Sequence, residues 1–510
     1  MARRESLRSR ASHSNTPPVF SVTYLGHQGW SVRGRQGHVL LDPLLTDEYS
    51  PGFSAEIYPP RRFALGKFPP VDAVVLSHEH ADHVNLPSLA LLDRCVPIVL
   101  PARSARAIRD AIAALGFRVL PSRTGDRFTA GDLEVTLLGG ATPGVQLDWE
   151  VTNLQIVVAD RAHHGSFFTY VDSWPSAETL ASIRRDVGRL GVLCHANNVM
   201  DWSCHEAGPG RLGAPSESQF AAELLTAEAS WWRPGDAPLV TAICGPGLSF
   251  RGDDAWMNQI LCVDSERVCQ ALHAVAVDRM FRAPVPGETV ELVAGRVRRI
   301  APSAPFVRVL DRSAWPSLTV PRRAWIDEFP PACGERSLDD TAWPVLLAEL
   351  DRLAAFLYRR ELFHAVLALD AATPRKRKPA FALVLRCDRD DLAHVFEYQP
   401  EANRFTRARA TRPLETYALG LECWAPDLHR VLVGQMLPQR LLGHLRTWSF
   451  SPTPLSPLFA VWGFFDALHR PAAASAFYGA LVKQLRDRPT VITAGRHARS
   501  VRVRRRRAPG

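Results

Sequence analysis

The chain has 510 residues, of which 46% are hydrophobic and 22% are charged, and it carries a formal net charge of +9. A chain of this length predicts two or three domains at about 150 residues each, and its composition is that of a soluble globular protein. No apolar run approaches the ~20 residues of a membrane helix, and no apolar segment follows the basic N-terminus as in a secretory signal, so we expect neither feature.

Positive charge is concentrated at the two ends of the chain. Residues 1–18 carry a net +3 and residues 496–510 a net +7, which together exceed the +9 of the whole chain. We therefore predict disordered basic tails at residues 1–18 and 491–510. This distribution argues against a basic, nucleic-acid-binding body, and nucleic acid is not indicated beyond the tails.

Between residues 19 and 260, short apolar runs alternate with helical patterns. VDAVVLS at residues 71–77 is a continuous apolar run, typical of a strand that is covered on both faces. The strand-like segments are 19–45, which contains a turn, 71–77, 96–101, 133–139, 152–160, 166–172 and 191–196. The helical segments are 86–92, 102–115 and 176–189. This alternation predicts an α/β domain of sheets covered by helices over residues 19–260.

The pattern changes in the C-terminal half. Residues 261–339 are expected to connect two domains, because much of this segment is rich in Pro, Arg and Trp. Residues 340–490 predict a C-terminal α+β domain that is mixed but largely helical, with strand-like alternation over 386–425. The apolar stretch that begins at Leu421 has helical spacing, which is typical of either a core or the surface of a homodimer.

The nine cysteines are dispersed along the chain, and no two of them form a CxxC pair. An odd, scattered set of this kind predicts reduced thiols in a cytoplasmic protein. It gives no indication of a zinc ribbon or an iron–sulfur cluster.

The strongest chemical signal is the run SHEHADH at residues 77–83, directly after the buried strand. Alternate residues of an extended segment point the same way, so His78 and His80 share one side. A turn would then bring Asp82 and His83 to the same centre. Neutral imidazoles suit zinc or iron, and a carboxylate suits a second, harder metal or a metal-bound water. We therefore predict a metal site at the carboxyl end of this strand, where α/β folds place their sites.

This run and its surroundings resemble a known family. With VDAVVLS before it and HVLLDPLL upstream, the run is similar to the metallo-β-lactamase superfamily. The layout of YLGHQGWSVRGRQGHVLLDP, SHEHADH and FFTYVDSW resembles one branch, which holds ascorbate-6-phosphate lactonases and the phospholipase D that cleaves N-acylphosphatidylethanolamine. It also resembles the non-Rieske part of CMP-N-acetylneuraminate hydroxylase. The resemblance covers roughly residues 20–260 and implies an αββα sandwich there.

The resemblance also implies roles for particular residues. His78 and His80 would bind a first metal, and Asp82 and His83 would bind a second. Asp172, at the end of FFTYVD, matches an aspartate that bridges two metals. Its alternative role is that of a turn or helix-capping residue.

Further candidates lie elsewhere between residues 19 and 260. Asp42, in LLDP, matches an aspartate that supports the metal ligands, or it is a turn residue at a strand end. His195 is either the last ligand to the second metal or a packed histidine that is hydrogen-bonded through its ring. Asn197 and Asn198 are candidates for contacts with a substrate, and His27, in LGHQGW, for a substrate-binding or supporting role.

The sequence departs from the family pattern at one position. The family has a further histidine after a strand, at a place where this chain has GGATPG at residues 139–144. Asp148 or Glu150 could replace the missing ligand, whereas His163 and His164 fall in a predicted hairpin turn that would aim them at solvent. One metal is therefore expected, and a second stays open.

Together these features predict a metal-dependent hydrolase that acts on a small-molecule substrate. A bound metal lowers the pKa of its water towards ~7, and the resulting hydroxide can attack an ester, lactone, amide or phosphodiester. Asp82 would orient that water and accept its proton. The expected cofactor is Zn²⁺, as one or two ions, with iron as an alternative. Two other functions stay open, namely an iron-dependent oxidoreductase on the same fold and a degenerate, non-catalytic binding protein.

Overall fold

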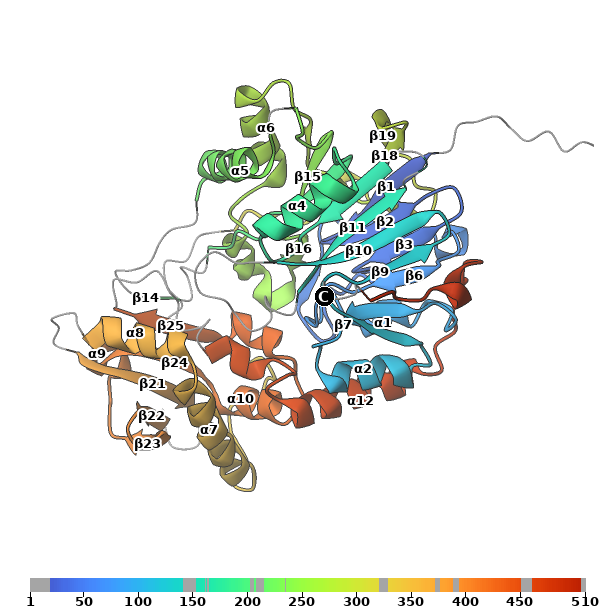
Figure 1. Ribbon diagram of the computed structural model, residues 1–510. Helices are drawn as coiled ribbons and strands as arrows, with labels where there is room; N and C mark the ends of the chain where they lie inside the picture. Colours follow the sequence, from blue (N-terminus) through green and yellow to red (C-terminus); the bar gives the residue numbers. More distant parts are fainter. Residues whose placement is uncertain are drawn as a thin grey trace, which may run out of the picture.

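The structure is a computed structural model that describes residues 19–140, 153–160, 162, 165–201, 206–207, 215–233, 235–320, 329–371, 377–388, 394–450 and 461–505. Figure 1 shows an N-terminal part, coloured blue to green, and a neighbouring C-terminal part, coloured gold to orange. The last helix, drawn in red, returns to the N-terminal part. The predicted tail at residues 1–18 lies outside the described residues.

The first sheet of the N-terminal part has the strand order β19-β18-β1-β2-β3-β6-β7-β8. Its strands are β1 (Phe20–Gly26), β2 (Gly29–Arg33), β3 (His38–Leu41), β6 (Ala73–Val75), β7 (Ile98–Pro101), β8 (Val119–Ser122), β18 (Glu288–Val293) and β19 (Arg296–Pro302). Strands β1 to β3 pair antiparallel, whereas β3, β6, β7 and β8 run parallel. Every residue of β6 and β7 is buried, which explains why these strands are continuously apolar in sequence.

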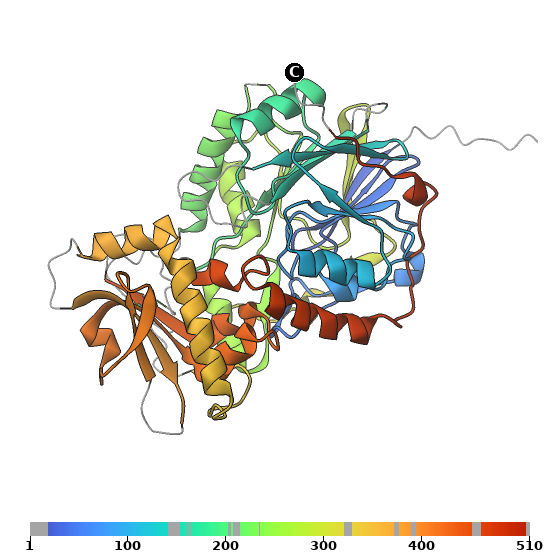
Figure 2. The same cartoon turned by 60° about the horizontal axis from the view of Figure 1, so that its bottom comes forward.

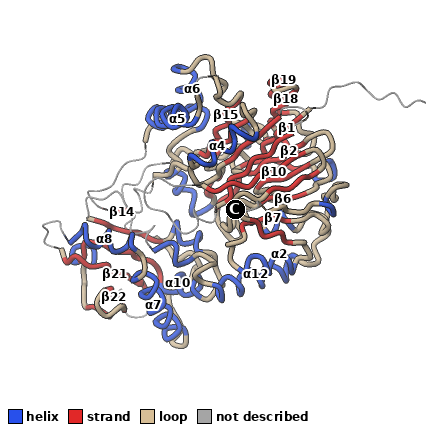
Figure 3. Tube along the Cα trace, in the orientation of Figure 1, coloured by secondary structure: helices blue, strands red, loops and turns tan. Residues whose placement is uncertain are grey.

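The second sheet faces the first and has the strand order β17-β15-β13-β12-β11-β10-β9. Its strands are β9 (Arg127–Ala130), β10 (Leu133–Gly139), β11 (Leu154–Asp160), β12 (Gly165–Thr169), β13 (Val192–Ala196), β15 (Val240–Cys244) and β17 (Phe281–Arg282). Figure 3 shows the strands of the two sheets as stacked layers. Between them, Val22 and Trp30 of the first sheet share one core with Val135, Ile156 and Phe167 of the second.

Helices cover both outer faces of this sandwich. The first sheet carries α1 (Leu86–Leu89), α2 (Arg106–Ala114) and α12 (Pro471–Leu485), and the second carries α4 (Ala177–Asp186), α5 (Glu217–Trp231) and α6 (Ser265–Val275). Figure 2 shows α12 alongside α2. The layers are therefore helix, sheet, sheet, helix, as predicted for the N-terminal domain. No described helix has the length and apolar character that a membrane crossing requires.

Short elements fix the loop between β3 and β6. In this region β4 (Ala55–Ile57) pairs with β16 (Leu248–Phe250), and β5 (Arg61–Phe63) pairs with β20 (Val307–Val309). The short 3-10 helices of the N-terminal part are η1 (Leu65–Lys67), η3 (Gly252–Ile260) and η4 (Arg312–Ala314). The backbone N–H of Tyr49 donates to the carbonyl of Ala55 at 3.1 Å, so the pairing of β4 also holds Tyr49 in place.

The C-terminal part is built on a mixed sheet with helices around it, so a mixed α+β fold is found there, although it is not clearly largely helical. The sheet has the strand order β14-β25-β24-β21-β22-β23. Its strands are β14 (Glu206–Ala207), β21 (Lys378–Arg386), β22 (His394–Gln399), β23 (Arg404–Ala408), β24 (Tyr417–Trp424) and β25 (Leu445–Ser449). Its helices are α7 (Ala342–Tyr358), α8 (Glu361–Ala371), α9 (Pro413–Thr416) and α10 (Ala425–Leu432), with η5 (Pro438–Gly443) and η6 (Gly463–Phe465). Strands β22, β23 and β24 lie within residues 386–425, where the sequence predicted strand-like alternation.

The apolar stretch that begins at Leu421 forms a core and not an exposed face. Leu421, Cys423, Leu428 and Leu432 are all buried in one cluster of the C-terminal part. The core alternative of the prediction is therefore confirmed for these residues.

Residues 261–339 do more than connect two domains. Strand β18 pairs with β1, and β17 pairs with β15, so this segment adds strands to both sheets of the sandwich. Val290 and Leu292 of β18 point into the core between the sheets, and Leu292 is fully buried. Burial of these apolar residues accounts for the pairing. Strand β14, conversely, lies before residue 260 in sequence and pairs with β25 of the C-terminal sheet.

The segment from Val491 to Arg505 is not a free tail, contrary to the prediction. Ile492 and Val501 are each 1% exposed, and the backbone N–H of Ile492 donates to the carbonyl of Leu91 at 3.0 Å. The two terminal NH₂ groups of the Arg118 guanidinium also donate to this segment. Nη1 donates to the carbonyl of Val501, and Nη2 donates to the carbonyl of Ala498. The apolar residues between the arginines thus dock the segment on the first sheet, which net charge alone could not predict.

We expect Ile492→Ala to destabilise the protein by about 2–5 kcal/mol, because it leaves a cavity in a packed core. The neighbouring Val491 is 42% exposed, so Val491→Ala should change the free energy of unfolding by less than about 0.5 kcal/mol. Urea unfolding of the two variants measures the difference. Equal stability of the two variants would contradict the docking of this segment.

Candidate metal centre

The run at residues 77–83 leaves β6 at the carboxyl edge of the parallel strands. The backbone N–H of His83 donates to the carbonyl of His80 at 3.0 Å and closes a turn, as predicted. This turn brings Asp82 and His83 back towards His78. The ring centroids of His78 and His83 are 4.1 Å apart.

Two groups of donor atoms meet at this turn, and within each group the atoms lie no more than 4.8 Å apart. One group contains His78, His83 and Asp172, and the other contains His27, Asp82 and His83. The Nε2 atom of His83, which is shared, lies 3.5 Å from Oδ2 of Asp82 and 3.5 Å from Oδ2 of Asp172. Nε2 of His78 lies 3.3 Å from the same oxygen of Asp172. Residues that are far apart in sequence thus present nitrogen and oxygen atoms to one small volume.

His83 provides a test of whether these residues fit a cation. Its side chain is 1% exposed, and within the described part of the chain its Nε2 takes part in no hydrogen bond. A buried polar atom without a hydrogen bond costs free energy unless another group meets it. The facing carboxylates and imidazole make a mixed nitrogen and oxygen donor set of the kind that zinc or iron takes. The residues present therefore fit a transition-metal cation.

Asp42 holds two residues of the run from behind. Its Oδ1 accepts from the backbone N–H of Ser77 at 2.8 Å, and its Oδ2 accepts from the Ser77 hydroxyl at 2.6 Å. The same Oδ2 lies 2.9 Å from Nδ1 of His83. A carboxylate that accepts from Nδ1 leaves Nε2 of His83 as the atom that faces the centre. The Ser77 hydroxyl in turn lies 3.0 Å from Nδ1 of His78, so the Nε2 atom of this ring also faces the centre.

His27 and Tyr49 hold Asp82 from the other side. Nε2 of His27 lies 3.1 Å from Oδ2 of Asp82, and the Tyr49 hydroxyl donates to the same oxygen at 2.8 Å. Nδ1 of His27 lies 2.8 Å from the carbonyl of Pro246. Because a carbonyl can only accept, Nδ1 of His27 carries a proton, and its Nε2 is the nitrogen that faces Asp82. The expected role of His27 near the site is consistent with this position, whereas the sequence pattern gave no indication of Tyr49.

The shifts in pKa indicate that Asp82 and His83 each favour the charged form of the other. Burial alone would raise the pKa of Asp82, but His83 and His27 outweigh it and lower that pKa well below its ordinary value. Burial alone would lower the pKa of His83, but the carboxylates of Asp82 and Asp42 raise it to about 10. Buried carboxylates that favour an added proton on His83 also favour a metal cation at its Nε2.

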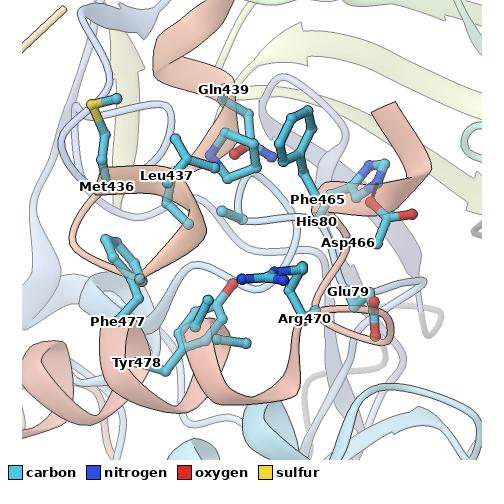
Figure 4. Close-up of a pocket in the computed structure, with 17 residues that line it drawn as sticks. Glu79, His80, Met436, Leu437, Gln439, Phe465, Asp466, Arg470, Phe477 and Tyr478 are labelled. Carbon is cyan, nitrogen blue, oxygen red and sulfur yellow. Dashed lines mark ion pairs between the residues drawn. The ribbon is translucent and has the colours of Figure 1, made fainter. Parts of the chain in front are cut away.

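His80 lies at the edge of the centre and belongs to neither of the two donor groups. Its Nε2 lies 3.9 Å from Oδ1 of Asp466, a residue of the C-terminal part. No motif marks Asp466 in the sequence, so sequence reasoning missed it. The two residues also line a cavity of about 60 Å³ whose other walls come mainly from the C-terminal part, as Figure 4 shows.

His195 does not join the donor groups, in contrast to its expected role as a ligand. Its Nδ1 contacts the hydroxyl of Tyr170, and its ring packs 5.7 Å from that of Phe220. The cause is the alternation along β13, where Cys194 faces the core between the sheets while Leu193 and His195 face the outer helices. Burial lowers the pKa of His195 to about 3, as for a packed neutral histidine. This placement agrees with the alternative interpretation of a packed, hydrogen-bonded ring.

Asn197 and Asn198 have different surroundings. The Asn198 side-chain amide donates to Oδ1 of Asp172 at 2.5 Å, so it contacts the centre through that carboxylate. The amide of Asn197 donates to the carbonyl of Val263 at 2.9 Å and to the Ser265 hydroxyl at 3.0 Å. Asn197 is buried and joins two loops, so its position gives no support to a role in substrate binding.

Several candidates for the missing ligand cannot be placed. The segment from Ala141 to Thr152, with Asp148 and Glu150, lies outside the described residues. His163 and His164 lie outside them as well. Their proposed roles stay predictions.

Comparisons with known proteins agree with this picture for part of the chain. Residues 38–175, roughly a quarter of the chain, match a family model described as Beta-lactamase superfamily domain. Among solved structures, the chain is similar to CmlA, a diiron beta-hydroxylase from Streptomyces venezuelae, with 15% identity, a TM-score of 0.35 and 55% of each chain covered. The chain thus spans about half the length of CmlA.

Two hydrolase structures are also similar. Igni18, a metallo hydrolase from Ignicoccus hospitalis, has 16% identity and a TM-score of 0.33 over 54% of this chain and 98% of that one. Isothiocyanate hydrolase from Delia radicum gut bacteria has 14% identity and a TM-score of 0.38 over 54% of this chain and 100% of that one. Likenesses at this distance carry no argument about activity. The sequence match shows that residues 38–175 are similar to the Beta-lactamase superfamily domain.

Proposed function

We propose that this protein is a metal-dependent hydrolase. The observation that carries the proposal is the position of Nε2 of His83, which is buried and 3.5 Å from a carboxylate oxygen of both Asp82 and Asp172. Together with His78, these residues make a donor set suited to zinc, with iron as the alternative metal. His78, His83 and Asp172 would hold one cation, and Oδ2 of Asp82 lies 3.5 Å from the shared Nε2 of His83.

When bound, such a cation supplies Lewis acidity and lowers the pKa of a coordinated water to about 7. We assign to Asp82 the role of orienting the water and accepting its proton. His27 and Tyr49 support this role, because both lie within hydrogen-bond distance of Oδ2 of Asp82. Since Nδ1 of His27 is committed to the carbonyl of Pro246, the pair formed by His27 Nε2 and Asp82 can hold the transferred proton.

The substrate class that fits this chemistry is a small molecule with an ester, lactone, amide or phosphodiester bond. Free thiols are found at Cys95, Cys194, Cys244, Cys269, Cys333, Cys387 and Cys423, which supports a reducing compartment, and we propose a cytoplasmic location.

The proposal is tested on full-length protein purified without added metal. We expect about one zinc per chain by elemental analysis, hydrolysis of at least one member of a panel of p-nitrophenyl esters, lactones and phosphodiesters, and loss of both after dialysis against a chelator. Re-addition of Zn²⁺ should restore the hydrolysis. Bound iron with no hydrolysis would favour an oxidoreductase, and protein without any transition metal would refute the proposal.

A further inference from the structure

A carboxylate of the C-terminal part, that of Asp466, lies beside His80 of the run at residues 77–83. Nε2 of His80 lies 3.9 Å from Oδ1 of Asp466, and the two side chains are 20% and 9% exposed. Figure 4 shows the carboxylate of Asp466 beside the imidazole of His80. More than 380 residues separate the two in sequence, so the contact depends on how the C-terminal part folds back onto the N-terminal domain.

The position of Asp466 is fixed by the elements around it. Its carbonyl accepts from the backbone N–H groups of His469 and Arg470, at 2.9 and 3.0 Å, in the turn that precedes α12. Helix α12 then buries Tyr478 and Val482 in the same core as α1 and α2 of the N-terminal domain. The Arg470 guanidinium contacts Glu349 of α7 and so ties this turn to the C-terminal part. Asp466 is therefore anchored on both sides.

The other histidines of the run suggest what Asp466 does. His83 and His78 each direct Nε2 to the centre, and each has an oxygen atom near Nδ1, from Asp42 and Ser77 respectively. Histidines that bind metals generally use their second ring nitrogen in this way, because an outer hydrogen bond fixes the tautomer and the orientation of the ring. In His80 the nitrogen that lies near a carboxylate of the C-terminal part is Nε2.

We propose that Asp466 is the positioning residue of His80, and that the C-terminal part thereby completes the metal centre. The proposal rests on the proposed function, since it requires that the centre binds a metal. The 3.9 Å separation exceeds a hydrogen bond of about 2.7–3.2 Å, so binding of the cation should shorten it. The C-terminal domain then acts on the affinity of the centre for metal as well as on the shape of the cavity.

The experiment is a titration of metal-free, full-length protein with Co²⁺, followed by its visible absorption bands. We expect Asp466→Ala to weaken Co²⁺ binding by roughly 10- to 100-fold and to change the absorption bands. The Co²⁺ affinity of Asp466→Asn should lie between those of Asp466→Ala and the wild type. The matched control is Asp254→Ala. Asp254 is also 9% exposed and lies 3.2 Å from Nε2 of His444, but it lies outside both donor groups. This control should keep the wild-type affinity and spectrum.

The outcomes separate the two proposals. If the wild type binds no Co²⁺, the proposed function fails. If the wild type binds Co²⁺ and Asp466→Ala binds it with the same affinity and spectrum, the positioning role of Asp466 is wrong while the proposed function stands. A lower melting temperature of metal-free Asp466→Ala with unchanged Co²⁺ binding would likewise show a purely structural role.

Discussion

His83→Ala should bind less than roughly a tenth of the metal that the wild-type protein binds. A metal centre with few protein ligands loses most of its affinity when a ligand common to both donor groups is removed. His83 belongs to both donor groups, and its Nε2 lies 3.5 Å from Asp82 and from Asp172. Alanine removes this nitrogen and leaves the two carboxylates without the imidazole between them. Hydrolysis of any substrate found in the panel should fall with the metal content. Elemental analysis of the purified variant measures the loss.

The control for this variant is a buried histidine of the same sheet that is outside the centre. His38 is 3% exposed, and its ring nitrogens lie 2.8 Å from the Ser31 hydroxyl and 2.9 Å from the carbonyl of Pro70. We expect His38→Gln to lower the melting temperature yet to keep the wild-type metal content. If His83→Ala binds as much metal as His38→Gln, the donor groups described above do not form the metal site.

The parts of the centre that lie close together in sequence could be predicted from the sequence. His78, Asp82 and His83 occupy one strand end and one turn, and local geometry alone brings them together. The roles of Asp172 and Asp42 could be predicted only from the family resemblance, because the sequence around each residue does not indicate which loop it contacts in the fold. The structure places both of these residues against the run, at distances that the sequence could not provide.

Tyr49 and Asp466 show where sequence reasoning stops. Tyr49 lies in a loop without regular periodicity, and its contact with Asp82 depends on the pairing of β4 with β16, nearly 200 residues later in sequence. Asp466 depends on the docking of α12 across the domain boundary. Both contacts join segments that are far apart in the chain, and neither segment has a pattern that marks its partner. The same reason explains why β18 and the segment around Ile492 were assigned to a connection and a tail.

Asp42→Asn should weaken Zn²⁺ binding by roughly 10- to 100-fold, although Asp42 does not face the cation. Oδ2 of Asp42 meets two donors, the Ser77 hydroxyl at 2.6 Å and Nδ1 of His83 at 2.9 Å. An amide NH₂ at this place would face both donors, so the His83 ring would lose the acceptor that holds it. Asp42 has a φ of 40°, a left-handed conformation that asparagine tolerates, so the backbone should keep its shape.

The matched control for Asp42→Asn is Asp72→Asn. Asp72 is 2% exposed and accepts from the backbone N–H groups of His38 and His497, at 3.0 and 2.8 Å, but it has no contact with the metal run. Both variants leave buried donors with a poorer acceptor, so each should lose about 1–3 kcal/mol of stability in urea unfolding of the metal-free protein. Calorimetric titration with Zn²⁺ separates them, because the affinity should fall for Asp42→Asn alone. Equal Zn²⁺ affinity of the two variants would mean that the orientation of His83 does not depend on Asp42, since loss of stability alone is common to both.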